Sequence, residues 1–288
     1  MRVLAAISFA LACGACGGDD GGATRPLVFG GARPVELQLP ADFDAARTYP
    51  LLIILHGYSV NGFIQQSYFR LFDAATTYQM LVLAPEGTTD SGGKQFWNAD
   101  PACCNFDGSA VDDVAYLGGV IDDVMAAWPV DPAQVMLIGH SNGAFMAYRL
   151  ACDRADVVTA IAGLAGHAAA DGVACAPARP VDILHMHGTL DDEVPYPSGE
   201  FLGVRSPGAV ESVAQWAAHN GCTGAPAVTG HADLDSTVAG DETAVTVTGG
   251  CPAGGAAELW TIEGANHIPT PSATFSTDIM AWLIAHRR

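Results

Sequence analysis

Residues 135–148 constrain the fold of this chain more than any other part of its sequence. They read Val-Met-Leu-Ile-Gly-His-Ser-Asn-Gly-Ala-Phe-Met-Ala-Tyr, so an apolar run enters a Gly-x-Ser-x-Gly motif and a helical pattern leaves it. A strand that turns sharply into a helix needs glycine at 139 and 143, because side chains there would hold the two elements apart. The pattern predicts a nucleophile elbow, a tight turn that projects Ser141.

Strands and helices alternate on both sides of this motif. Helical patterns cover residues 62–79, 111–128 and 276–285. Short apolar runs, typical of strands buried on both faces of a parallel sheet, cover residues 51–55, 80–84, 135–138, 161–164 and 183–186. The alternation predicts an α/β fold with a mostly parallel central sheet and helices on both faces. We expect one catalytic-sized domain over residues 26–288, in which residues 223–255 form a hairpin or insertion.

Composition limits the partners that the protein can have. Half of the 288 residues are hydrophobic, which is enough for one substantial core. The 12 Lys and Arg against 31 Asp and Glu give a formal charge of −19, which would repel a nucleic-acid backbone. We therefore expect no nucleic-acid partner, and no apolar segment after the N-terminus is long enough to predict a membrane span.

The N-terminus resembles an export signal. In residues 1–16, Arg2 precedes an apolar run that is too short to span a bilayer. A flexible Gly/Asp tether over residues 17–25 begins directly after Cys16, which favours a bacterial lipoprotein acylated on Cys16 over one acylated on Cys13. A plainly cleaved secretory signal is the alternative. Both predict a protein outside the cytoplasm, and the first predicts membrane attachment through Cys16.

Export makes the other cysteines candidates for disulfides. They are Cys103, Cys104, Cys152, Cys175, Cys222 and Cys251. We predict one pair, Cys222 with Cys251, because these residues bracket a Gly/Thr/Ala-rich segment with little core of its own. Closing such a loop stabilises a fold by about 3 kcal/mol. A zinc site is the competing interpretation, but residues 17–288 contain no Cys-x-x-Cys pair, and no metal is expected.

A serine hydroxyl is a weak nucleophile, so it needs a base and an acid that orients the base. Behind a nucleophile elbow the chain order is serine, acid, histidine. Asp191 is the first choice for the acid, in a loop after a buried strand, with Asp192 and Glu193 as rivals. His267 is the predicted base, in a loop between the last strand and the last helix.

The oxyanion that forms during acyl transfer needs preorganised donors. One is predicted to be the backbone amide of Asn142, which follows the nucleophile, and the other the amide of Tyr58 after an early strand. Gly57 allows the close approach of that second loop.

His185 and His187 form a His-x-His pattern on one face of a strand. Such a pair occurs in metal sites, but no third ligand is positioned convincingly. We expect these side chains to pack and hydrogen-bond at the end of the strand.

Together these motifs resemble a family of secreted esterases that includes polyhydroxybutyrate depolymerases and the feruloyl and acetylxylan esterases of the first carbohydrate esterase family. The resemblance covers most of the chain after the tether. It rests on Leu-His56-Gly57, Trp97-Asn98-Ala with Cys103-Cys104, Val111-Asp112-Asp113-Val114, Gly-His-Ser141-Asn-Gly-Ala-Phe-Met, His187-Gly-Thr-x-Asp191-x-x-Val-Pro-Tyr196 and Gly-x-x-His267. It implies an α/β-hydrolase fold, a Ser141, Asp191 and His267 triad, and no cofactor. The chain departs from the family at Ile268-Pro269-Thr270, where many members carry Trp-Pro-Gly.

Aromatic residues flank the expected site. Trp97 and Tyr196, with Phe96 and Tyr58, are predicted to line an acyl or aromatic pocket, with core packing as the alternative. The resemblance implies a small or oligomeric ester substrate, either a feruloylated or acetylated saccharide or a hydroxyalkanoate oligomer. Two other functions remain open, a serine peptidase of similar fold and a non-catalytic lipid-anchored binding protein on a hydrolase scaffold.

Overall fold

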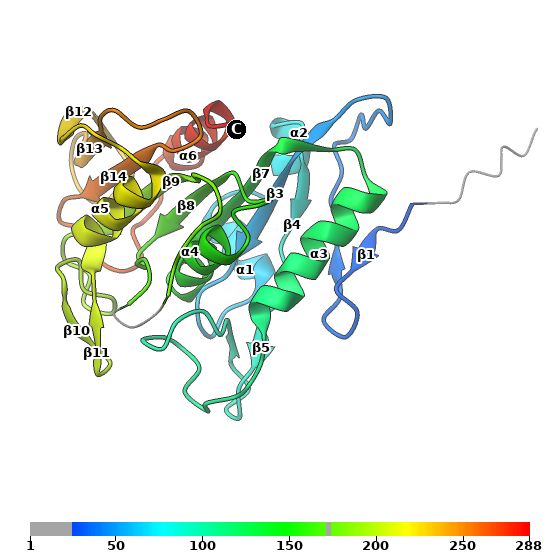
Figure 1. The fold of residues 1–288 in the computed structure, drawn as a ribbon, viewed down its shortest axis with the longest axis horizontal. Helices are drawn as coiled ribbons and strands as arrows, with labels where there is room; N and C mark the ends of the chain where they lie inside the picture. Colours follow the sequence, from blue (N-terminus) through cyan, green and yellow to red (C-terminus); the bar gives the residue numbers. More distant parts are fainter. Residues whose placement is uncertain (1–24, 171–173) are drawn as a thin grey trace, which may run out of the picture.

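The computed structural model describes residues 25–170 and 174–288 (Figure 1). Residues 1–24, with the predicted export signal and Cys16, lie outside the described residues. An eight-stranded sheet runs through the molecule in the order β12-β13-β14-β9-β8-β7-β3-β4. The strands are β3 (Tyr49–Leu55), β4 (Leu81–Leu83), β7 (Val130–His140), β8 (Ala160–Leu164), β9 (Asp182–Gly188), β12 (Pro226–Ala232), β13 (Thr243–Thr248) and β14 (Ala257–Ile262).

Six of these strands, from β14 to β4, pair in parallel. Their side chains are almost completely buried, as a sheet covered on both faces requires. The antiparallel β12–β13 hairpin extends the sheet beyond β14. The predicted fold class is confirmed, and the segment expected to be a hairpin or insertion is an edge hairpin.

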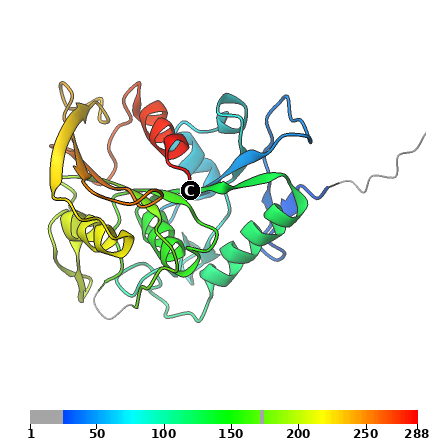
Figure 2. The same ribbon diagram turned by 45° about the horizontal axis from the view of Figure 1, so that its top comes forward.

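Helices cover both faces of the sheet. Figure 2 shows α6 (Phe275–Ala285) on one side and α3 (Asp113–Ala127), α4 (Asn142–Asp153) and α5 (Gly208–Asn220) on the other. The side of α6 also carries α1 (Gly62–Tyr68) and α2 (Ala74–Thr77), and the core is divided between the two faces accordingly. The single helix expected over residues 62–79 is two short helices, because Arg70 between them adopts φ +53°.

In the described part of the chain, three short hairpins lie outside the main sheet. They pair β1 (Val28–Phe29) with β2 (Val35–Glu36), β5 (Thr88–Thr89) with β6 (Gln95–Phe96), and β10 (Gly199–Phe201) with β11 (Val204–Ser206). The predicted disulfide between Cys222 and Cys251 is present, and Cys152 pairs with Cys175 and Cys103 with Cys104. Within the described ranges, no helix is long and apolar enough to cross a bilayer.

The carboxyl ends of parallel strands meet at one edge of a sheet, where α/β proteins carry their ligand sites. The loops after β3, β7, β9 and β14 leave from this edge. They carry every residue that the sequence assigns to the triad and the oxyanion donors.

Candidate active site

The predicted nucleophile lies in the turn between β7 and α4. Ser141 has φ +53° and ψ −122°, and its amide donates to the carbonyl of Leu164 at 2.8 Å. A side chain on Gly139 would collide with the carbonyl of Gly143, and one on Gly143 would collide with the carbonyl of Leu55. Gly139 is therefore required for β7 and α4 to approach each other, and Gly143 is required for α4 to approach the end of β3. This strained strand-to-helix turn has the geometry predicted for a nucleophile elbow.

Asp191 lies in the loop after β9 with its side chain fully buried. Its Oδ2 is 2.8 Å from His267 Nδ1 and 3.2 Å from His187 Nε2, while Oδ1 accepts from the amides of Glu193 at 3.0 Å and Val194 at 2.8 Å. Burial by itself raises the pKa of this carboxyl, but the hydrogen bonds from His187 and His267 outweigh burial and hold the pKa well below its usual range. Asp191 is therefore a carboxylate at any working pH.

The two rival acids lie elsewhere. Asp192 is exposed, and the carboxylate of Glu193 is also largely exposed. Glu193 Oε2 approaches His267 only at 3.9 Å, and it does so at Nε2 instead of Nδ1. Asp191 is therefore the acid that the structure brings to the imidazole nitrogen that an orienting carboxylate must hold.

The loop of His267 is tied to the nucleophile turn through His140, which precedes Ser141. The Nε2 of His140 lies 3.0 Å from the carbonyl oxygen of His267, and the two rings are 5.0 Å apart. Burial, and then the nearby His267, lower the pKa of His140 to about 4, so it is a neutral ring that donates through Nε2. Among the described residues Ser141 Oγ has no hydrogen-bond partner, and contacts of this kind often close only when substrate binds.

The acid and base loops are packed against each other. A side chain on Gly188 would collide with the carbonyl of Ala265, and the amide of Leu190 donates to that carbonyl at 2.9 Å. Further along, Tyr68 donates its hydroxyl to the carbonyl of Pro269 at 2.8 Å. The position of His267 is thus set by contacts with β9 and α1.

The predicted oxyanion donors lie on either side of Ser141. A Cβ on Gly57 would lie 3.5 Å from the Cβ of Ser141, so this loop passes directly beside the nucleophile. Neither the Tyr58 amide nor the Asn142 amide has a hydrogen-bond partner within the described structure. Asn142 is also the first residue of α4, where the helix dipole favours negative charge.

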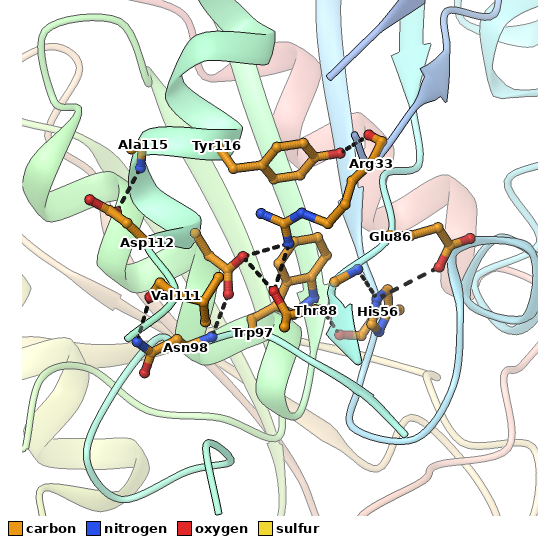
Figure 3. Close-up of polar contacts among 12 residues, drawn as sticks. Arg33, His56, Glu86, Thr88, Trp97, Asn98, Val111, Asp112, Ala115 and Tyr116 are labelled. Carbon is orange, nitrogen blue, oxygen red and sulfur yellow. Dashed lines mark hydrogen bonds and ion pairs between the residues drawn. The ribbon is translucent and has the colours of Figure 1, made fainter. Parts of the chain in front are cut away.

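Residues 56–58 form the predicted oxyanion loop, and the side chain of His56 (Figure 3) holds this loop in place. The Nε2 of His56 accepts from the amide of Gly87 at 2.9 Å, and its Nδ1 lies 2.8 Å from the carbonyl of Gly57. Burial lowers the pKa of His56 to about 4, which keeps the ring neutral with its proton on Nδ1. Trp97 Nε1 donates to the carbonyl of His56 at 3.0 Å (Figure 3).

The predicted place of Trp97 in a substrate pocket needs correction. The indole exposes none of its surface, and it packs against His56 at the start of the predicted oxyanion loop (Figure 3). Its backbone also pairs with the Asn142 side chain: the Trp97 amide donates to Oδ1 at 2.6 Å and Asn142 Nδ2 donates to the Trp97 carbonyl at 2.9 Å. Trp97 therefore supports both predicted oxyanion donors from within the core.

An ion pair that the sequence does not predict anchors the segment of Trp97 and Asn98. Asp113, at the start of α3, places Oδ1 2.6 Å from Arg33 Nη1 and accepts from the Asn98 amide at 2.7 Å through Oδ2 (Figure 3). Arg33 lies in the turn between β1 and β2, far from any recognisable motif. Asp112, which precedes Asp113, caps α3 by accepting from the Ala115 amide at 2.9 Å.

Tyr196 lies beside His187, close to the loop that carries Asp191. Its hydroxyl is 2.9 Å from Thr261 Oγ1, and its ring meets the ring of His187 at 5.6 Å. The half-buried side chain borders an apolar groove of about 500 Å³ between α5 and β14, whose lining includes Val213 and Leu259. Contact between Tyr196 and substrate stays a prediction.

His185 and His187 hydrogen-bond to each other at 3.1 Å, as predicted for this pattern. Across residues 25–170 and 174–288, no group of three or more His, Cys, Asp or Glu side chains is placed to hold a metal ion.

The sequence is similar to the sequences of known esterases. Residues 28–231 match the family model described as "Putative esterase". The chain is 32% identical over 202 residues to feruloyl esterase B of Piromyces equi, covering 67% of this chain and 37% of that protein. It is 24% identical over 286 residues to feruloyl esterase D of Neurospora crassa, covering 94% of this chain and 87% of that protein.

The first curated relatives are much longer proteins, and the chain spans 37% and 41% of the length of two of them. Among solved structures, an acetyl xylan esterase from Aspergillus awamori superimposes with a TM-score of 0.59 at 13% identity, over 87% of this chain and 93% of that one. This likeness supports the α/β-hydrolase fold expected from the sequence. With its family model matched over most of its length, the chain belongs to the esterase family.

Proposed function

We propose that this protein is an exported serine esterase that hydrolyses carboxylic esters through an acyl-enzyme on Ser141. One observation carries the proposal: Asp191 holds Nδ1 of His267 at 2.8 Å, in a loop tied to the turn that projects Ser141. The chain order of serine, acid and histidine, and two unpartnered amides beside the serine, support the same function.

In the first half of the reaction, Ser141 Oγ attacks the ester carbonyl and its proton passes to His267 Nε2. Asp191 keeps the other nitrogen protonated and stabilises the imidazolium that forms. The carbonyl oxygen becomes an oxyanion, which the amides of Tyr58 and Asn142 stabilise. His267 then protonates the departing alcohol, leaving the acyl group on Ser141.

In the second half, water replaces the alcohol. His267 takes a proton from water as its oxygen attacks the acyl carbonyl, and the same amides stabilise the second oxyanion. Collapse releases the acid and returns the proton to Ser141. All the groups that these steps need are supplied by the protein, so the proposal includes no cofactor.

The proposed substrates are feruloyl or acetyl esters of polysaccharides and hydroxyalkanoate-type oligoesters. Relatives named as feruloyl esterases support the first class. The proposed location is outside the cytoplasm, either secreted or as a bacterial lipoprotein anchored through Cys16, and the disulfides support an oxidising compartment.

A panel of esters tests the proposal. Residues 26–288 are assayed on a short p-nitrophenyl ester, methyl ferulate, acetylated xylan and a hydroxybutyrate oligomer, with Ser141→Ala as the control. We expect turnover of at least one natural ester and its loss in the control, with unchanged circular dichroism. Retained turnover in the folded Ser141→Ala variant would contradict the assignment of the nucleophile.

Labelling by a fluorophosphonate probe separates the remaining alternatives. A non-catalytic binding protein does not react with the probe, whereas an esterase reacts at Ser141. A protein that labels but hydrolyses only peptide substrates would be a serine peptidase.

A further inference from the structure

Three buried titratable side chains behind the acid have no part in the steps above. Tyr148 lies on α4, and His185 and His187 lie on β9. Tyr148 is 2% exposed, and both histidines are fully buried. Burying such groups is costly unless each polar atom has a partner, so their arrangement calls for a physical reason.

The three side chains form a continuous chain of hydrogen bonds that ends on Asp191. The Tyr148 hydroxyl lies 2.7 Å from His185 Nδ1, and His185 Nε2 lies 3.1 Å from His187 Nδ1. His187 Nε2 lies 3.2 Å from Asp191 Oδ2 and 2.8 Å from the carbonyl oxygen of Val194. Every ring nitrogen of His185 and His187 therefore has a hydrogen-bond partner.

The groups at the two ends of this series of hydrogen bonds determine which atom of each pair donates. A carbonyl and a carboxylate only accept, so His187 Nε2 must carry a proton. At the other end, the Tyr148 hydroxyl donates to His185 Nδ1, so His185 carries its proton on Nε2 and donates to His187 Nδ1. Burial raises the pKa of Tyr148 and lowers that of His185, so a phenol donor and a neutral imidazole are the forms expected there.

We infer that Tyr148, His185 and His187 are positioning residues, forming a neutral relay that holds the Asp191 carboxylate against His267. This inference rests on the proposed function of the triad. The relay supplies Oδ2 with a second donor that carries no charge, so the charge of Asp191 remains available to the imidazolium of His267. It also links α4, which begins directly after Ser141, to the loop that carries the acid.

The Tyr148 hydroxyl acts on the acid through the tautomers of the two rings. Without its proton donor, His185 is free to protonate Nδ1 and to leave Nε2 as an acceptor. His187 then donates through Nδ1 and turns an unprotonated Nε2 toward Asp191, where two acceptors repel each other. Tyr148 thereby selects the one neutral arrangement in which every contact from Tyr148 to Asp191 has both a donor and an acceptor.

Paired variants separate a donated hydrogen bond from simple packing. His187→Gln keeps an N–H near the position of Nε2, and His187→Leu removes it. Tyr148→Phe removes only the hydroxyl at the far end of the relay. His231→Leu is the matched control, since His231 is an exposed histidine on β12.

Each folded variant is assayed for kcat and KM on the best ester, and the proton between His267 and Asp191 is followed by its low-field NMR resonance. We expect His187→Leu to lower kcat by about 10- to 100-fold, as for a misplaced catalytic group, with KM nearly unchanged and the resonance shifted or lost. His187→Gln restores most of kcat and the resonance. Tyr148→Phe shows a smaller loss in the same direction, and His231→Leu behaves as the unmodified protein.

Equal impairment of His187→Gln and His187→Leu would overturn the inference, because it would indicate packing alone. Unchanged kcat and resonance in His187→Leu would overturn it as well. If His187→Leu does not fold, Tyr148→Phe decides, and unchanged kcat and resonance in that variant count against the relay. Failure of the proposed function is distinguishable, because the unmodified protein would then not hydrolyse esters, whereas the resonance is measured without substrate.

Discussion

The side chain of Asn142 pairs with the backbone of Trp97 through two hydrogen bonds, of 2.6 Å and 2.9 Å. One residue thus has two roles: its amide is a predicted oxyanion donor, and its side chain fixes the segment that supports the other donor. Trp97 Nε1 completes this link by holding the carbonyl of His56. The proposed oxyanion site is therefore rigid before substrate arrives, which is the condition under which such donors are most effective.

Replacing Asn142 by Ala tests this link. The variant leaves the Trp97 amide and carbonyl without their partner in the core, and we expect a loss of about 1 to 3 kcal/mol in the free energy of unfolding. Because the Asn142 amide is kept, kcat falls through misplacement of the oxyanion loop more than KM rises. Urea unfolding and steady-state kinetics measure the two effects. Unchanged kcat would show that the hydrogen bonds between Asn142 and Trp97 do not control the position of the predicted oxyanion donors.

The acid assignment is tested by Asp191→Asn and Asp192→Asn. We expect the first to lower kcat by about 10⁴-fold, as when the acid of a triad is replaced by its amide. The second should leave kcat within about twofold, because Asp192 is exposed and lies apart from His267. If Asp192→Asn instead lowers kcat severely on the same ester and Asp191→Asn does not, the acid is Asp192.

The ion pair between Arg33 and Asp113 predicts a cost far from the reacting atoms. Arg33→Ala leaves the fully buried carboxylate of Asp113 without its counter-ion, and we expect the free energy of unfolding to fall by about 3 kcal/mol. Arg287→Ala is the matched control, because Arg287 is 59% exposed in its pair with Asp131 and such pairs contribute little. Similar losses in the two variants, compared by urea unfolding, would contradict the role given to Asp113.

His167 predicts a dependence of stability on pH. Its ring is 1% exposed, its Nε2 has no hydrogen-bond partner among the described residues, and burial lowers its pKa to about 4 from an ordinary 6.5. The unfolded chain therefore binds a proton that the folded protein does not, so this group's contribution to stability is present above pH 6.5 and is lost as the pH falls toward 4.

The variant His167→Leu should lack this contribution. Between pH 6.5 and 4, the unfolding free energy of the unmodified protein should fall faster than that of the variant, by up to about 1.4 kcal/mol per pH unit. Denaturant unfolding at several pH values measures both slopes, and other titrating groups cancel in the difference. Parallel slopes would mean that His167 is protonated when folded.

Much of the fold was predictable because it depends on local patterns. Apolar runs mark the parallel strands, and the Gly-x-Ser-x-Gly motif marks a turn in which a side chain on Gly139 would collide with nearby Gly143. The disulfide between Cys222 and Cys251 followed from the loop that it closes. Helix α5 is not among the predicted helices, and residues 62–79 form two helices instead of the predicted one because Arg70 adopts a left-handed conformation.

What the sequence by itself determined is the order of elements and the residue types at the ends of the strands, because both arise from short-range periodicity and motif spacing. Only the tertiary structure decided which atoms meet. The choice of Asp191 over Asp192, the burial of Trp97 and the contact of Arg33 with Asp113 depend on parts of the chain far apart in sequence. So does the line of partners from Tyr148 to Asp191, because a hydrogen bond requires a distance and a direction that no linear pattern specifies.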